Sequence, residues 1–388
     1  MENKHQAYDL AQMQSLPLEA KIRMTKERIK AWYESWTRFE ICDGVTGKTR
    51  FVTIDTRHGG EPPLKETEYI VSAIDGQVYV SFSGGKDSTV LKHIVDSMYD
   101  DVPALFVNTG LEYPEIQKFA MSQKNVITVR PAMRFDEVIK KYGYPVVSKE
   151  VADTVYGAQH SGGSGKYKTT RLQRLHGELL DKQGRKSAYN CERWKFLLEA
   201  PFEISPKCCG VMKKQPAQKY SKETGRKQIV GTMASESRLR YSNWLKNGCN
   251  AFESKKPSSQ PLSFWTEQDI LHYIKKYNVP YCSVYGDIVV DFNDNALDNQ
   301  INIIDYLGEY APEDRLKTTK CKRTGCIFCM FGCHLEKEPN RFQRLKETHP
   351  RQYEYCIGGG ETIDGKWQPN KQGLGLGKVL DYIGVKYD

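Results

Sequence analysis

The 388-residue sequence has no apolar run of about 18 residues, the length that a membrane-spanning helix requires. Its first residues, Met1 to His5, lead into no hydrophobic segment of the kind that directs secretion. No internal repeat is present. These absences predict an intracellular, cytoplasmic protein with no membrane association, and 39% hydrophobic residues are enough for one large or two ordinary domains with a core.

A reducing compartment keeps thiols free, so the 11 cysteines need a reason other than disulfide bonding. Some are grouped in the sequence and others stand alone. The grouped ones are Cys208, Cys209, Cys321, Cys326, Cys329 and Cys333, whereas Cys42, Cys191, Cys249 and Cys282 are isolated. Isolated cysteines are typical packing residues. Grouped ones favour a bound metal ion or cluster.

The sequence lacks the G-x-x-x-x-G-K-[ST] phosphate loop of the common NTPases, but it contains Ser-Gly-Gly-Lys-Asp-Ser at 83–88. This string follows the apolar run 78–82 and precedes the helix-like run 89–95. A strand that turns through glycines into a helix directs backbone N–H groups and the positive end of the helix dipole at one point, which suits a phosphate. The alternative is an ordinary glycine-rich turn. We expect Lys86 and Asp87 to lie on a solvent-facing loop.

Alternating strands and helices from Gln77 onward predict an α/β fold, a parallel twisted sheet with helices on both faces. Predicted strands are 78–82, 104–107, 126–129 and 229–231, and predicted helices are 16–39, 88–99, 114–122 and 265–277, the last capped by Thr266 with Asp269. Residues 40–75 are predicted to be an inserted hairpin or loop, and 159–190, with Gly162–Gly165, a mobile or irregular segment. The chain is therefore predicted to have three parts. Residues 1–75 form an N-terminal helix and the inserted hairpin or loop, residues 76–290 form the α/β domain with a basic insertion at about 150–200, and residues 291–388 form a cysteine-rich C-terminal region.

Positive charge is concentrated between Lys149 and Lys227, where 17 Lys and Arg face 8 Asp and Glu. The resulting +9 equals the net charge of the whole chain. Tyr167, His176, Tyr189 and Trp194 interleave with these cations, as on a surface for single-stranded nucleic acid. A solvated surface, with some lysines framing the phosphate site and the aromatic residues in the core, is the alternative.

Several motifs occur in a characteristic order between Gln77 and about Phe331. They are the loop 83–88, Leu105–Gly110 followed by Tyr113-Pro114-Glu115, Cys208-Cys209 with Lys213 and Pro216, Gly231 through Glu236-Ser237, Pro261-Leu262 with Trp265-Thr266 and Asp269-Ile270, and Cys326-x-x-Cys329. In this set the chain resembles the phosphoadenosine phosphosulfate (PAPS) reductase family, part of the adenine nucleotide alpha hydrolase superfamily of pyrophosphate-loop ATP pyrophosphatases. The resemblance implies that the chain binds ATP or an adenylyl sulfate with Mg²⁺.

The resemblance also implies roles for individual residues. The nucleotide would be bound by Ser83, Gly84, Gly85, Lys86, Asp87, Ser88, Asn108, Thr109, Gly110 and Gly231. Lys86 would neutralise charge on departing pyrophosphate, and Asp87 would orient Mg²⁺ or the loop. Glu236 is a candidate partner of Mg²⁺ or ribose; a salt bridge to Arg238 or Lys227 is its alternative role. The candidates for binding the substrate anion are Lys213, Lys214, Arg238 and Arg240.

In the cluster-containing branch of the family, a tandem Cys-Cys and a later Cys-x-x-Cys hold a 4Fe-4S cluster, which here implies Cys208, Cys209, Cys326 and Cys329. The alternative is a local Zn²⁺ site built from Cys321, Cys326, Cys329, Cys333 and His334. A zinc site would leave the tandem pair at 208–209 unexplained.

Three departures from the family pattern bear on the reaction. Asn108 stands where family reductases usually have Asp, and Met212 and Met233 stand where they have Arg. Two guanidinium groups that would bind sulfate or phosphate are thereby missing, although Lys214, Arg238 and Arg240 are near. The C-terminal Glu-Cys-Gly-x-His-like tail of the reductases is also missing, and Cys356 is predicted to be a buried or idle thiol.

These departures favour ATP-dependent adenylation and thiolation of an acceptor, with release of pyrophosphate and with sulfur supplied by a donor protein. The first alternative is a thiol- or cluster-dependent reductase that converts adenylyl sulfate or PAPS to sulfite and takes electrons from a donor protein. The second is a nucleotide-sensing, nucleic-acid-binding component of a larger complex, with 40–75 and 159–190 as interaction surfaces.

Overall fold

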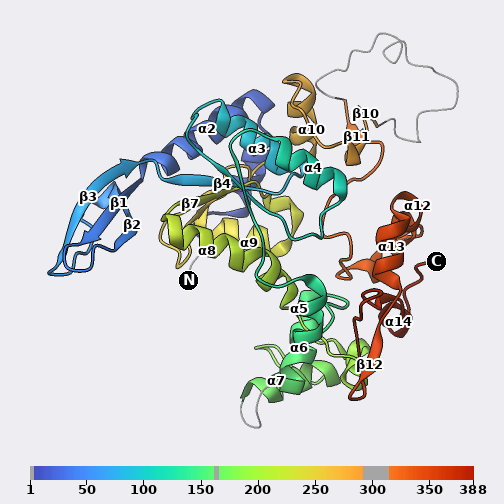
Figure 1. Ribbon diagram of the computed structural model, residues 1–388. Coiled ribbons are helices and arrows are strands. Elements are labelled where there is room, and N and C mark those ends of the chain that lie inside the picture. The colour runs from blue at the N-terminus through green and yellow to red at the C-terminus, as the bar shows by residue number, and fades with distance from the viewer. Residues whose placement is uncertain (1–3, 161–165, 292–313) are drawn as a thin grey trace, which may run out of the picture. The chain divides into compact units, whose positions relative to one another are not determined.

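The computed structural model describes residues 4–160, 166–291 and 314–388 (Figure 1). The chain forms two compact units, each built from segments that are separated in sequence. The first unit comprises Met1–Asn108, Tyr113–Val129 and Ala217–Thr324, and the second comprises Thr109–Glu112, Arg130–Pro216 and Gly325–Asp388. The predicted glycine-rich tract Gly162–Gly165 lies outside the described residues. No helix in the described part of the chain has both the length and the apolar character to cross a bilayer.

A six-stranded sheet forms the centre of the first unit, in the order β6-β5-β4-β7-β9-β8. Its strands are β4 (Val78–Phe82), β5 (Ala104–Val107), β6 (Val126–Val129), β7 (Lys227–Val230), β8 (Asn250–Ala251) and β9 (Ser258–Ser259). All neighbouring pairs are parallel except β8 with β9. Parallel strands end at the same edge of a sheet, so β4, β5 and β7 present their carboxyl ends together. The predicted α/β fold is confirmed.

Helices cover both faces of this sheet. Successive side chains of β4 point to opposite faces, and each face is apolar, so each is buried against its own set of helices. Val78, Val80 and Phe82 belong to the large core cluster that also includes residues of α2 (Leu18–Glu34), α3 (Lys86–Asp96) and α10 (Glu267–Lys276). Tyr79 instead packs against Tyr220 of α8 (Gln215–Thr224), with ring centroids 5.2 Å apart. The other elements of this unit are α1 (Ala7–Gln14), α4 (Pro114–Ser122), α9 (Arg238–Asn247), β10 (Ile288–Val290) and β11 (Leu316–Thr318).

The predicted helix over residues 16–39 is too long by a few residues. Helix α2 ends at Glu34, and Trp36 begins β1 (Trp36–Asp43), the central strand of a separate antiparallel sheet with β2 (Thr49–Asp55) and β3 (Glu68–Asp75). Trp36 pairs with Asp55 across β2, and its ring packs edge-on against Trp32 at 5.0 Å. The residues from 36 onward are thus held by strand pairing, and the predicted hairpin or loop at 40–75 is most of a three-stranded sheet (Figure 1).

The second unit is mainly helical. Its helices are α5 (Phe135–Tyr142), α6 (Lys149–His160), α7 (Lys166–His176), α12 (Arg341–Thr348), α13 (Pro350–Ile357) and α14 (Leu376–Tyr382), with a hairpin of β12 (Glu361–Ile363) and β13 (Lys366–Gln368). The prediction of an irregular segment at 159–190 is wrong for its middle part, because α7 packs on α6. Leu175 is fully buried, and Arg171 forms an ion pair with Asp153 at 2.9 Å.

Candidate functional site

The Ser83–Ser88 turn joins the end of β4 to the first residue of α3, as the sequence predicts. Gly84 has φ of +72°, a conformation that residues with a side chain rarely adopt. A Cβ at this position would also lie 3.0 Å from the side chain of Ile116, which is closer than ordinary contact. The hydroxyls of Ser83 and Ser88 are 3.0 Å apart, and the backbone N–H of Ser83 donates to the Ser88 hydroxyl at 3.2 Å. These bonds hold the turn in one shape at the N-terminus of a helix, the arrangement that binds phosphate.

Lys86 is buried, with 3% of its surface exposed, which corrects the expectation of a solvent-facing side chain. Lys86 is the first residue of α3. Its ammonium group is surrounded by oxygen atoms. Nζ is 3.1 Å from Oε1 of Glu267 and donates to the carbonyl of Lys322 at 3.0 Å. The ammonium is therefore fixed in position, and both of its partners come from segments that the sequence did not assign to the site.

The carboxylate of Asp87 has a buried oxygen atom without a hydrogen-bond donor among the described residues. Its Oδ1 atom is buried, lies 3.8 Å from Nζ of Lys86, and accepts no hydrogen bond from the described residues. Burial raises the pKa of this carboxyl, while Lys86 and Arg323 oppose the rise. Buried polar atoms in native proteins are normally satisfied, and a carboxylate oxygen is a preferred ligand of Mg²⁺. The residues present therefore fit a Mg²⁺ ion brought with a nucleotide.

The raised pKa of Asp87 predicts how the stability of the protein depends on pH. A folded-state pKa above the unfolded value means that the ionised carboxylate destabilises the fold, and that the penalty grows as pH rises from the ordinary value of 3.8 through the raised one. We expect Asp87→Asn to raise the melting temperature of the ligand-free protein at pH 7. The gain should disappear as pH falls below that ordinary value, which thermal unfolding as a function of pH would measure. An equal gain at every pH would contradict the prediction.

Gly231 follows β7 and lies directly against the loop. A Cβ at this position would be 3.1 Å from the carbonyl oxygen of Asp87 and 3.3 Å from Cα of Ser88, closer than ordinary contact. Only glycine lets the end of β7 approach the start of α3 this closely.

Glu236 lies just beyond Gly231 and is engaged by two arginines. It forms an ion pair with Arg240, and its Oε1 is 3.2 Å from Nη2 of Arg323. Its other oxygen accepts from the backbone N–H of Met233 at 2.9 Å. Glu236 is thus in a salt bridge, the alternative role considered above, but with other partners. The side chain of Arg238 is exposed.

Tyr285 is a site residue that the sequence analysis missed. Its hydroxyl accepts a hydrogen bond from the backbone N–H of Lys86 at 3.1 Å and is 2.8 Å from the hydroxyl of Thr324. The side chain is 2% exposed. The N–H of Lys86 is one of the helix-terminal donors that a bound phosphate would use. The Tyr285 hydroxyl therefore accepts from an N–H group that a phosphate bound at this helix terminus would use.

We expect Tyr285→Phe to lower the free energy of unfolding of the ligand-free protein by about 1–3 kcal/mol, because a buried N–H loses its acceptor. Saturating Mg·ATP should reduce this deficit, since a phosphate oxygen then accepts from Lys86. Tyr281→Phe is the matched control, because the Tyr281 hydroxyl donates to the carbonyl of Gly286 at 3.0 Å. Thermal unfolding with and without nucleotide measures both variants. A deficit that nucleotide leaves unchanged in Tyr285→Phe would contradict the prediction.

The three residues that depart from the family pattern are all buried. Asn108, at the end of β5, is 5% exposed, and its N–H donates to the carbonyl of Val129 at 2.8 Å. Met233 is 3% exposed in the core of the first unit, and Met212 is 1% exposed in the second. Where the family reductases place arginine, this chain places buried apolar side chains.

Thr109 and Gly110 belong to the second unit, in a loop closed by Glu112. The carboxylate of Glu112 accepts from the N–H of Thr109 at 3.0 Å and from its hydroxyl at 2.8 Å. Gly110 has φ of +73°, which glycine adopts without strain. Lys213 lies 3.9 Å from Glu112. The neighbouring thiol of Cys326 and this carboxylate raise the pKa of Lys213 against the effect of burial.

The four cysteines assigned to a cluster all lie in the second unit and interact electrostatically. Cys208 and Cys209 precede a π-helical turn at Gly210–Lys214, and their Sγ atoms are 3.8 Å apart. The Cys208–Cys209 hydrogen bond and burial raise the pKa of Cys208, and the thiols of Cys329 and Cys326 raise it further. Burial raises the pKa of Cys326 to about 11. Short π-helical turns often mark functional sites.

A single metal ion and a cluster make different demands on these thiols. Among the described residues, no group of three or more His, Cys, Asp or Glu side chains converges on one ion position. A zinc site requires that convergence, whereas a 4Fe-4S cluster spreads its four thiolates over separate irons. Cys321 lies in the first unit, where its Sγ donates to the carbonyl of Arg323. The four cysteines predicted to hold a cluster thus belong to one unit, whereas the residues of the zinc alternative are divided between the two units.

A cationic pocket of about 430 Å³ lies beside Cys209 in the second unit. Its lining residues are Tyr142, Lys149, Pro206, Lys207, Cys209, Gly210, Val211, Lys214 and Gln215. The hydrogen bond from Cys208 lowers the pKa of Cys209 against the effect of burial, and Lys149 and Lys213 lower it further. Lys207 lies over the rings of Tyr142 and Tyr156, 4.9 and 4.3 Å from their centroids. Lys149 and Lys207 line this pocket together with Lys214, and the sequence analysis had not assigned them to a site.

Cys356 is fully buried in α13, and burial raises its pKa well above the usual range. A thiol in this environment remains protonated and out of reach of a substrate. The structure agrees with the prediction of a buried thiol.

The fold and the loop define a nucleotide-binding α/β protein. The family model described as the phosphoadenosine phosphosulfate reductase domain matches residues 77–155 and 167–330, well over half of the chain. The chain therefore belongs to this family of nucleotide-binding enzymes of sulfur metabolism.

Two individual proteins are similar over smaller parts. An uncharacterised protein of Methanocaldococcus jannaschii is 35% identical over 72 residues, which is 18% of this chain and 18% of that protein's length. The crystal structure of PAPS reductase from Candida auris, in a phosphate complex, aligns with 53% of this chain and 75% of its own at 16% identity, with a TM-score of 0.30.

Proposed function

We propose that the chain binds Mg·ATP at Ser83–Ser88, cleaves it between the alpha and beta phosphates to adenylate an acceptor, and supports transfer of sulfur to that acceptor. The observation that carries the proposal is the pairing of the buried Lys86 ammonium with the unsatisfied Oδ1 of Asp87 at the start of α3. A fixed cation and a carboxylate oxygen awaiting a metal are what a Mg²⁺-bound triphosphate requires.

In the proposed reaction an oxygen of the acceptor attacks the alpha phosphorus, and the bond between that phosphorus and the bridging oxygen breaks. Pyrophosphate leaves with the electron pair, and the Lys86 ammonium neutralises the charge that develops on it. The Ser83 and Ser88 hydroxyls and the N–H groups at the start of α3 hold the phosphate oxygens. A sulfur nucleophile then attacks the acceptor carbon that carries the adenylated oxygen, and AMP leaves.

The buried methionines and the buried C-terminal thiol support ATP over an adenylyl sulfate. Met212 and Met233 leave the substrate without two guanidinium groups suited to sulfate or to a second phosphate. Cys356, fully buried, has no access to a substrate sulfur. Both features fit a family member whose nucleotide substrate is not an adenylyl sulfate.

For the sulfur-transfer half, the proposed site is the pocket beside Cys209. Lys149, Lys207 and Lys214 supply positive charge for an anionic acceptor or sulfur carrier. A 4Fe-4S cluster held by Cys208, Cys209, Cys326 and Cys329 would have a thiolate on each of its four irons, so it would supply electron-transfer chemistry and the sulfur would come from an external donor. The lysines would hold the anion in place while sulfur is delivered.

The test is to supply the anaerobically purified protein with two sets of substrates. One contains Mg·ATP, sulfide and a pool of acceptors from the cell, and the other contains adenylyl sulfate or PAPS with a thiol or reduced electron carrier. We expect AMP and pyrophosphate in equal amounts from the first set and no sulfite from the second. Sulfite from the second set, without pyrophosphate from the first, would assign a reductase. Nucleotide binding without turnover in either set would favour a nucleotide-sensing component.

A further inference from the structure

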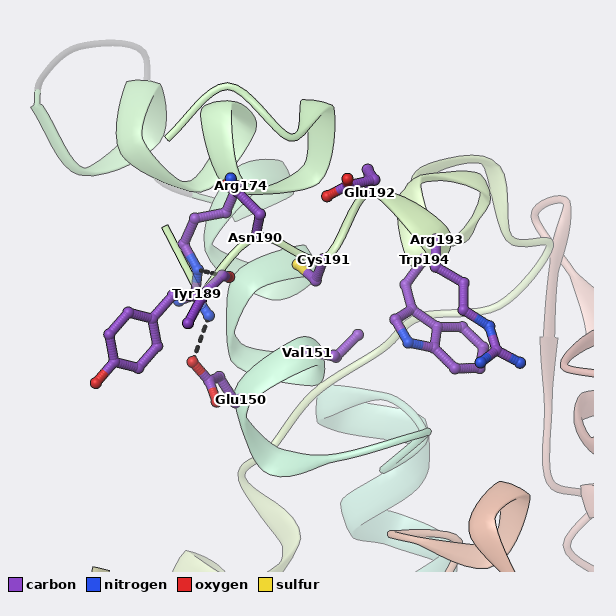
Figure 2. Close-up of a pocket in the computed structure, with 10 residues that line it drawn as sticks. Glu150, Val151, Arg174, Tyr189, Asn190, Cys191, Glu192, Arg193 and Trp194 are labelled. Atoms are coloured by element: carbon purple, nitrogen blue, oxygen red, sulfur yellow. Dashed lines mark hydrogen bonds and ion pairs between the residues drawn. The ribbon is translucent and has the colours of Figure 1, made fainter. Parts of the chain in front are cut away.

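A second pocket in the second unit belongs neither to the nucleotide loop nor to the cysteine group. It has a volume of about 470 Å³ and is shown in Figure 2. Its lining residues are Glu150, Val151, Arg174, Ala188, Tyr189, Asn190, Cys191, Glu192, Arg193 and Trp194. We call it the Arg174–Trp194 pocket. A cavity of this size is large enough for a single nucleotide.

Two aromatic rings and two guanidinium groups line the Arg174–Trp194 pocket. The Tyr189 side chain is 65% exposed, and the guanidinium of Arg174 is 5.8 Å from its ring centroid. The Arg193 guanidinium lies 5.0 Å from the ring of Trp194, which is 9% exposed. Figure 2 shows Tyr189 and Trp194 on opposite sides of Val151. Aromatic rings and guanidinium planes are the surfaces on which unpaired bases stack.

The charges around the pocket leave a positive excess. Glu150 forms an ion pair with Arg174 at 2.5 Å, and Glu192 with Lys186 at 3.9 Å. Arg193 is exposed and has no carboxylate within ion-pair distance among the described residues. The negative charges of Glu150 and Glu192 are thus each neutralised by a cation, and the guanidinium of Arg193 is available to a phosphate group. The segment 149–227, to which these pocket residues belong, carries a net charge of +9, which favours a polyanion.

From these features we infer that the Arg174–Trp194 pocket receives one unstacked nucleotide of a single-stranded nucleic acid, with the base against Tyr189 and a phosphate on Arg193. The inference goes beyond the proposed function and rests on other residues, so either can fail alone. A double helix keeps its bases stacked and cannot present one to the pocket, which makes single strands the expected ligand.

The test measures binding of fluorescein-labelled U12 and dT12 to the full chain by fluorescence anisotropy at several salt concentrations. We expect Tyr189→Ala to weaken binding roughly 5- to 150-fold, the range for loss of one base-aromatic stack, and Tyr189→Phe to retain affinity. Arg193→Gln should lower the slope of log affinity on log salt by about 0.7, as expected for one phosphate contact on a single strand. U12 and dT12 distinguish RNA from DNA as the source. Tyr8→Ala is the matched control, because Tyr8 lies outside this unit and is 72% exposed.

Location is tested separately by photocrosslinking an oligonucleotide that carries one 5-iodouridine, followed by peptide mapping. We expect the crosslink within 189–194, and its loss in Tyr189→Ala. Unchanged affinity in both variants, a crosslink elsewhere, or equal binding of duplex and single strand would overturn the inference. Tyr189 and Arg193 have exposed side chains, so the variants should fold, and melting temperatures equal to that of the wild type would verify this.

Discussion

Replacing Lys86 with alanine is expected to reduce ATP-dependent pyrophosphate release by about a thousandfold, which corresponds to about 4 kcal/mol of transition-state stabilisation. The ammonium is fixed by Glu267 and the carbonyl of Lys322, so it requires no rearrangement as charge develops on the leaving pyrophosphate. Asp87→Ala should abolish turnover as well, because it removes the carboxylate proposed to orient Mg²⁺. Pyrophosphate release in single-turnover assays is the measurement.

Lys92 provides a matched control on the same helix. It is also buried, at 6% exposed, and its ammonium is 2.5 Å from the carboxylate of Asp96. We expect Lys92→Met to change melting temperature about as much as Lys86→Ala does, yet to retain turnover. If both lysine variants lose activity in parallel with stability, or if neither Lys86→Ala nor Asp87→Ala loses it, the loop does not carry the chemistry.

Anaerobically purified protein is expected to be brown and to contain about four irons per chain, the content of one 4Fe-4S cluster. Cys326→Ser or Cys329→Ser should lose most of this iron, because a hydroxyl replaces a thiolate ligand. Iron and zinc analysis together with the visible absorption spectrum would measure the loss. Cys42→Ser is the control, since Cys42 is half-buried on β1 in the first unit.

The outcome also separates the two metal alternatives. Stoichiometric zinc without iron in anaerobic preparations would assign the site to the local zinc alternative with Cys321, Cys326, Cys329 and Cys333. Loss of iron only after exposure to air leaves the cluster assignment intact, because exposed clusters oxidise. Variants that retain iron at both Cys326 and Cys329 would contradict the cluster.

Local features were predictable from the sequence where neighbouring residues decide the conformation. The apolar run of β4, the glycine pair and the start of α3 are contiguous, so the strand, turn and helix follow from short-range preferences. Thr266 and Asp269 cap α10 with reciprocal hydrogen bonds, in which the backbone N–H of each residue donates to the side chain of the other, as their spacing predicts. The positions of Trp36 and α7 were mispredicted because strand pairing with β2 and packing on α6 overrode the local pattern.

The sequence by itself therefore determined the central α/β fold, the phosphate-binding turn and the family, because each depends on residues close together in the chain or on an ordered set of motifs. Only the tertiary structure decided the environment of the site. Lys86 is buried, and its backbone N–H donates to the Tyr285 hydroxyl, because segments about 200 residues away fold onto the loop. Burial, ion pairing and the lining of a pocket depend on such distant contacts, which no local pattern records.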